Sequence, residues 1–220
     1  ANPVECFVLL MVVAVFARSG LRWWMSLAAA PCQLFCDLDG VLCDFDKKVQ
    51  EACGKPPDQL HPIDMWRALE GVDGGRPTGF FDQLEWTEDG QRLWTAIRHL
   101  HPVILTGLPQ GTWAAPQKRK WCARELGCAT KVITCKALQK CKYCRTGSLL
   151  IDDNLDLQQA WEKAGGIFIH HTTTARTLRK LQALRVLGHS NGTTALHAPA
   201  GEGSVPGADG SQQRRRKMRR

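Results

Sequence analysis

The sequence predicts an α/β fold: a Rossmann-like parallel sheet with flanking helices and a small helical segment inserted after the first strand. Two observations carry this prediction. Short apolar stretches alternate along the chain with longer amphipathic ones, a pattern typical of parallel strands joined by crossover helices. A long segment with helical spacing also separates the first apolar stretch from the second, which predicts the insertion.

The expected elements follow in chain order. The first strand begins at Gln33 and ends at Asp37, and the inserted helical segment covers about 46–100. The later strands are expected at 102–107, 131–135, from Ser148 onward and at 166–170, and the helices between and after them at 112–126, 155–165 and 174–187. No internal repeat interrupts this alternation.

Length and composition predict one domain with appendages. The chain has 220 residues, of which 44% are hydrophobic, enough for one full-sized core over 33–187. From Gly188 the composition turns to Gly, Ser, Thr, Ala and Pro, so we expect residues 188–220 to be a disordered basic tail. The last seven residues carry six of the positive charges behind the net charge of +8. A solvated appendage is the expectation, because no aromatic residues interleave with these charges to stack on nucleic-acid bases.

The N-terminal extension, 1–32, leaves three interpretations open. Its twelve-residue apolar run Cys6–Ala17 is too short for an ordinary membrane span and matches the core of a signal sequence. A signal or anchor, a non-native extension and a buried helix are the alternatives. We expect a cytoplasmic protein unless this segment targets the chain to an organelle or the secretory route.

Ten cysteines are not spaced like the disulfide framework of a small secreted domain, which favours reduced thiols in an intracellular compartment. The densest group is "CKALQKCKYC", with Cys135, Cys141 and Cys144. The gap between Cys141 and Cys144 fits a zinc knuckle or a redox pair, but no second close pair faces them, so ordinary thiols are the expectation.

Reactive side chains stand where three predicted strands end. Asp37 with Asp39, Thr106, and Asp152 with Asp153 hold these positions, and ligand sites of parallel sheets lie at the carboxyl ends of the strands. An acidic pair before a helix can be a mere N-cap, but that does not explain paired carboxylates at two strand ends. Carboxylates gathered at one edge repel one another, and Mg²⁺ with oxygen ligands fits such a site.

With these residues in place, the chain resembles the haloacid dehalogenase superfamily. "DLDGVLCDF", "ILTGLP", a lysine ahead of the fourth strand and "LLIDD" look like its four motifs in order. "FFDQLEWTEDGQRLW", "RKWCARELG" and "WEKAGGIFIHH" resemble the 5'(3')-deoxyribonucleotidase subgroup. The resemblance covers about Gln33 to Leu187, and it implies that the inserted segment is a small helical cap over the site.

The resemblance implies a role for each motif residue. Asp37 matches the nucleophile that forms an aspartyl-phosphate, and Asp39 the general acid and base. Thr106 and the backbone of Gly107 would hold phosphoryl oxygens. The magnesium site would consist of Asp37, the carbonyl of Asp39, Asp152 and Asp153.

The third motif offers three lysines, Lys136, Lys140 and Lys142, and the spacing to "SLLIDD" resembles the subgroup best if Lys140 binds phosphate. Lys118, on the helix after Thr106, is a candidate for a secondary phosphate contact, as is its neighbour Lys120. Residues two apart on a helix cannot share a face, so at least one of these two is expected on the surface. The subgroup commonly places a hydroxyl residue where this chain has Gly107.

Substrate choice is expected to rest on aromatic residues of the inserted segment. Phe45, just after the nucleophile loop, is the first candidate to stack on a nucleobase, with Trp66 and Trp86 as further substrate contacts. Of the other aromatic residues of this segment, Trp94 and one or both of Phe80 and Phe81 are expected in its core.

Together these observations predict a magnesium-dependent phosphomonoesterase, a 5'-nucleotidase acting on (deoxy)nucleoside monophosphates. The alternatives are a phosphatase for another small phosphate ester or a polynucleotide end, and a catalytically idle binding module. A complete set of mutually repelling carboxylates argues against the idle alternative, because without a metal their charges only cost stability. A nucleotide is the expected partner, with nucleic acid reached only through the tail and a membrane only through the N-terminal segment.

Overall fold

The computed structural model describes residues 33–71 and 79–187. The described residues belong to one compact unit. The expectations for the N-terminal apolar segment and for the basic tail lie outside the described residues. None of the helices in the described ranges combines the length and the apolar character that a membrane crossing requires.

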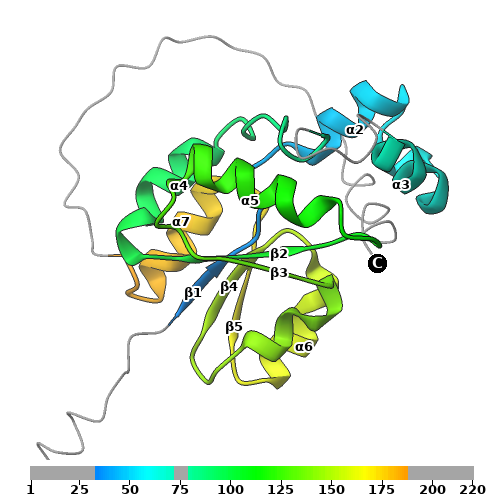
Figure 1. The fold of residues 1–220 in the computed structure, drawn as a ribbon. Coiled ribbons are helices and arrows are strands. Elements are labelled where there is room, and N and C mark those ends of the chain that lie inside the picture. The colour runs from blue at the N-terminus through cyan, green and yellow to red at the C-terminus, as the bar shows by residue number, and fades with distance from the viewer. Residues whose placement is uncertain (1–32, 72–78, 188–220) are drawn as a thin grey trace, which may run out of the picture. The chain divides into compact units, whose positions relative to one another are not determined.

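A five-stranded parallel sheet forms the centre of this unit, with the strand order β3-β2-β1-β4-β5 (Figure 1). The predicted fold class is confirmed, and each predicted strand is present. The strands are β1 (Leu34–Cys36), β2 (Val103–Gly107), β3 (Val132–Cys135), β4 (Leu149–Asp152) and β5 (Ile167–His170). Because β1 lies between β2 and β4, the residues that follow it stand between the ends of those two strands.

Both faces of the sheet are buried, which explains why its strands read as continuous apolar runs. Along β1, Leu34 and Cys36 join one hydrophobic cluster, whereas Phe35 between them joins the other. The helices α4 (Gly90–Ile97), α5 (Ala114–Glu125) and α7 (Thr174–Ala183) cover the first face, and α6 (Gln158–Lys163) covers the second (Figure 1). Three single-turn or short 3₁₀ segments complete this part: η3 (Arg98–Leu100), η4 (Ala137–Tyr143) and η5 (Leu155–Leu157).

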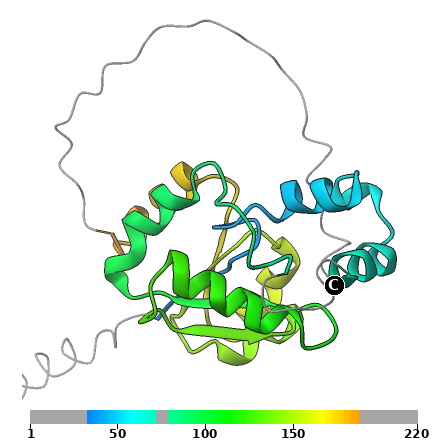
Figure 2. The same ribbon diagram turned by 45° about the horizontal axis from the view of Figure 1, so that its top comes forward.

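The inserted segment begins with a pair of packed helices, α2 (Phe45–Cys53) and α3 (Pro62–Gly71), joined through η1 (Pro57–Gln59). Asp44 caps α2 by accepting a hydrogen bond from the N–H of Lys47, and Gly54 ends it at φ 71°. The pair lies to one side of the sheet in both views (Figure 2).

The structure differs from the prediction in the extent of this segment. The expected range 46–100 includes α4, but α4 packs against α7 on the face of the sheet. Leu93 and Ile97 give α4 an apolar face that is fully buried in the first cluster. The part that stands beside the sheet is therefore shorter than predicted.

Candidate active site

Asp37 and Asp39 stand on the turn that follows β1. The N–H of Asp37 donates to Ile151 O at 2.8 Å, which ties the turn to β4. Leu38 is 1% exposed and points into the core, as the alternation of the strand predicts. Its carbonyl accepts hydrogen bonds from Leu42 N and Cys43 N, both at 2.9 Å. This closed turn leaves the two aspartates on the same side of the sheet edge.

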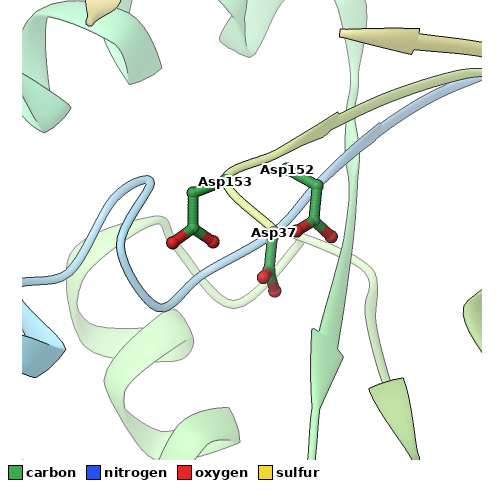
Figure 3. Close-up of side chains that lie close together, drawn as sticks. All are labelled: Asp37, Asp152 and Asp153. Atoms are coloured by element: carbon green, nitrogen blue, oxygen red, sulfur yellow. The ribbon is translucent and has the colours of Figure 1, made fainter. Parts of the chain in front are cut away.

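Asp152 and Asp153 stand where β4 ends, beside Asp37 (Figure 3). One carboxylate oxygen from each of these three residues lies within 4.8 Å of the others, an arrangement that could hold a metal ion. The N-cap interpretation does not account for the pair, because the cap of η5 is Asn154, whose side chain accepts from Asp156 N. Within the described ranges this is the one group of three His, Cys, Asp or Glu side chains with metal-binding spacing.

Lys140 completes this group. Its Nζ lies 2.9 Å from Asp37 Oδ1 and 2.7 Å from Asp152 Oδ2, and its side chain is 3% exposed. We call Lys140, Asp37, Asp152 and Asp153 the Lys140 cluster. Of the three lysines weighed from the sequence, Lys140 is the one at the site: Lys136 donates to Pro109 O, and Lys142 is exposed.

Burial and charge act in opposite directions on the Lys140 cluster. Burial by itself would lower the pKa of Lys140, but the carboxylates of Asp152 and Asp37 outweigh it and raise that pKa. Burial raises the pKa of Asp152, Lys140 lowers it, and Asp37 and Asp153 raise it further. The lysine thus keeps its proton, while its charge does not satisfy all the carboxylates around it.

A divalent cation fits the Lys140 cluster. Three carboxylates share one ammonium, so the negative groups of this cluster outnumber the positive one. Asp37 Oδ1 is also buried without accepting a hydrogen bond of good geometry from the described residues. Carboxylate oxygens are the ligands that hard cations such as Mg²⁺ and Ca²⁺ take. Asp37, Asp152 and Asp153 would hold the ion.

A second buried lysine, Lys118 of α5, binds the other aspartate. Its Nζ donates to Asp39 Oδ2 at 2.5 Å, to Thr106 Oγ1 at 2.9 Å and to Gly107 O at 2.7 Å. We call Lys118, Asp39, Thr106 and Gly107 the Lys118 cluster. The side chain of Asp39 is therefore part of this cluster and not of the three-carboxylate group, and only its backbone carbonyl is left as the metal ligand predicted for Asp39.

From the sequence, Lys118 is a candidate phosphate contact, whereas in the structure it binds Asp39. Lys120, two residues on, is half-exposed and binds Asp82 at 2.9 Å, as expected for one of two lysines on opposite helix faces. Gln117, which sequence reasoning did not single out, is fully buried and accepts a hydrogen bond from Phe81 N. No local pattern marks Gln117, because its partner lies in the inserted segment.

The aromatic residues predicted to contact substrate lie in different environments. Phe45 is 2% exposed, and its ring packs against Trp66, Phe80 and Phe81. A base could stack on Phe45 only if these neighbours moved. Trp66 is half-buried and keeps part of its surface open. Trp86 donates its Nε1–H to Glu125 and packs on Trp121.

All eight cysteines in the described part of the chain are free thiols. Cys36, Cys43 and Cys122 are fully buried, and burial raises the pKa of each. Cys141 and Cys144 are half-buried. Among the described residues no group of three cysteine or histidine side chains comes together.

Comparison with known proteins finds similarity among solved structures only. No protein-family model matches the chain, and no curated protein matches its sequence. Among solved structures, the chain is similar to a hydrolase from Streptococcus pneumoniae TIGR4, with 17% sequence identity and a TM-score of 0.41. The match covers 70% of this chain and 97% of the hydrolase.

Proposed function

We propose that the protein is a magnesium-dependent phosphomonoesterase that works through an aspartyl-phosphate on Asp37. The observation that carries this proposal is the division of the carboxylates at the sheet edge. Asp37 lies with Asp152, Asp153 and Lys140, whereas Asp39, two residues along the same turn, lies with Lys118 and Thr106. Each aspartate thus has its own buried lysine, and only Asp37 belongs to the group of carboxylates that could hold a metal ion.

In the first half of the reaction, an oxygen of Asp37 attacks the phosphorus and the bond from phosphorus to the ester oxygen breaks. Lys140, already 2.9 Å from Asp37 Oδ1, offsets the negative charge of the attacking carboxylate and of the phosphoryl group. Mg²⁺ would supply further positive charge between these two anions. Asp39 gives a proton to the departing alkoxide, which leaves as the alcohol.

In the second half, Asp39 takes a proton from water as the water attacks the phosphorus of the aspartyl-phosphate. The bond between phosphorus and the Asp37 oxygen breaks, which releases inorganic phosphate and restores both carboxyl groups. In both halves of the reaction, Thr106 and the backbone of Gly107, at the end of β2, would hold the phosphoryl oxygens.

Nucleoside monophosphates are the substrates we propose. Two features support this choice: the half-buried ring of Trp66 on α3, and the resemblance to deoxyribonucleotidases of the segments that begin at Phe80, Arg119 and Trp161. An aromatic ring with an open face can stack on a nucleobase. A phosphate-release screen of nucleotides and sugar phosphates with Mg²⁺ tests the choice, and preference for sugar phosphates would contradict it.

Two substitutions test the chemistry. Asp37→Asn should lower turnover by a factor on the order of 10⁴ or more, because it removes the nucleophile while changing one atom. Asp39→Asn should keep a burst of alcohol from p-nitrophenyl phosphate, whose leaving group needs little protonation, and then release phosphate slowly. Rapid-quench kinetics measures both, with Asp64→Asn, at an exposed position of α3, as the control. Equal, burst-free losses in the two variants would contradict the roles, and phosphate release from no ester by the wild type would favour the idle binding module.

A further inference from the structure

Lys118 is a buried charge whose hydrogen bonds are fully used. The residue is 0% exposed, and an ammonium has three N–H donors. Its three acceptors, Asp39 Oδ2, Thr106 Oγ1 and Gly107 O, come from the turn after β1 and from the end of β2. The ring of Phe81 lies 4.4 Å from Nζ on a further side. Lys118 therefore has no donor left for a phosphate oxygen.

The geometry points to Lys118 as a positioning residue that holds Asp39 for proton transfer and does not itself touch the substrate. The inference rests on the proposed function, because it concerns the residue that would act as acid and base there. It replaces the secondary phosphate contact that the sequence suggests for Lys118.

Positioning matters for Asp39 more than for Asp37. The side chain of Asp39 is 15% exposed and that of Asp37 is 8% exposed. An acid and base must also stay within hydrogen-bond reach of the leaving oxygen, so its position has to be held. Lys118 binds Asp39 and also Thr106 and Gly107, the two residues that we propose hold the phosphoryl group. The acid and base is thus fixed relative to the phosphate site.

A double-mutant cycle separates this role from a direct phosphate contact and from simple packing. The variants are Lys118→Met, Asp39→Asn and the two combined, each assayed with p-nitrophenyl phosphate and with an alkyl phosphate in Mg²⁺. A residue that acts only through its partner has no effect once the partner is disabled. Lys163→Met, which removes an exposed lysine at the end of α6, is the control for loss of one positive charge.

We expect Lys118→Met to lower kcat for the alkyl phosphate by roughly 10²-fold, within the range of general acid and base catalysis. KM should stay the same, and p-nitrophenyl phosphate should give the burst expected of Asp39→Asn. In the Asp39→Asn background, adding Lys118→Met should change kcat less than about threefold. A loss of the same size in both backgrounds would overturn the inference, and so would a rise in KM at constant kcat, which indicates a phosphate contact.

The cycle remains decisive if Lys118→Met does not fold. That variant leaves the Asp39 carboxylate without its ammonium, whereas the double variant removes both charges. Comparing Asp39→Asn with the double variant then suffices, because a further large loss overturns the inference and an unchanged kcat supports it. A wild type that hydrolyses no ester would remove the proposed function together with this inference, whereas an active wild type with additive losses would remove the inference alone.

Discussion

Lys118 and Lys140, two buried lysines at one edge of the sheet, bind different numbers of carboxylates. In the Lys118 cluster one ammonium meets one carboxylate, and its other two hydrogen bonds go to neutral oxygens. In the Lys140 cluster one ammonium meets Asp37 and Asp152, with Asp153 beside them. The first cluster pairs one carboxylate with its lysine, and in the second three carboxylates share one lysine. The difference separates the three carboxylates that could hold a metal ion from the carboxylate of Asp39, to which we assign proton transfer in the proposed function.

Removal of each lysine should have the largest effect on stability, and the two effects should differ in their response to Mg²⁺. Lys140→Met should lower the free energy of unfolding by about 3–5 kcal/mol in EDTA, because it leaves several buried carboxylates without a counter-charge. Mg²⁺ should restore part of that loss. Lys118→Met should cost less and should not be restored by Mg²⁺, since it affects the partly exposed carboxylate of Asp39. Denaturant unfolding with EDTA or Mg²⁺ measures both, and equal responses to Mg²⁺ would contradict the division.

His171, which lies outside both clusters, should give the next largest effect on stability, and this effect depends on pH. His171 follows β5, is 6% exposed and has Nδ1 2.9 Å from Thr177 Oγ1. Burial lowers the pKa of His171 from 6.5 to about 4, against the opposite influence of Asp89. Between these two values the unfolded chain binds a proton that the folded protein does not, so stability should fall as the pH falls from 6.5 to 4.

The size of this effect is up to about 3 kcal/mol, from 1.4 kcal/mol for each pKa unit. His171→Asn should remove it and leave the remaining acid sensitivity to the two lysine clusters. Denaturant unfolding at several pH values measures the slope. An unchanged slope in the variant would show that His171 is not the source.

A substitution at Gly107 should have a smaller effect, and it tests where phosphate binds. A Cβ at Gly107 would lie 3.4 Å from Ala137 Cβ, an ordinary contact, so Gly107→Ser has room for its side chain. Its hydroxyl would add a donor beside Thr106, and we expect KM for a phosphate ester to fall by roughly threefold to tenfold, the value of one hydrogen bond at about 0.5–1.5 kcal/mol. Gly107→Ala is the matched control and should not lower KM. The same KM in both variants would contradict the placement of phosphate at this turn.

The sequence was sufficient for the strands and for the carboxylates that follow them. Apolar runs mark strands directly, and the carboxyl ends of parallel strands meet at one edge, so the neighbourhood of Asp37 and Asp152 follows from chain order. The choice of Lys140 came from the spacing of the resembling family. These parts of the site depend on local pattern and on sheet topology alone.

The partners of Lys118 and the environment of Phe45 could not be predicted in this way. Which face of α5 turns inward is fixed by Trp121 and Gln117, whose contacts come from the inserted segment at 80–84. Phe45 lies in an aromatic group assembled from α2, α3 and that same segment. Contacts of this kind join residues far apart in the chain, and hydrophobic periodicity carries no information about which of them meet.

Under the proposed function, Mg²⁺ binds the carboxylates of Asp37, Asp152 and Asp153 and not the side chain of Asp39. Calorimetric titration of Mg²⁺ into the wild type, Asp153→Asn and Asp39→Asn tests it directly. We expect one ion per chain in the wild type, no measurable binding in Asp153→Asn, and wild-type binding in Asp39→Asn, whose side chain stays with Lys118 and whose backbone carbonyl is unchanged. Absence of binding in the wild type, or equal loss in both variants, would contradict the account.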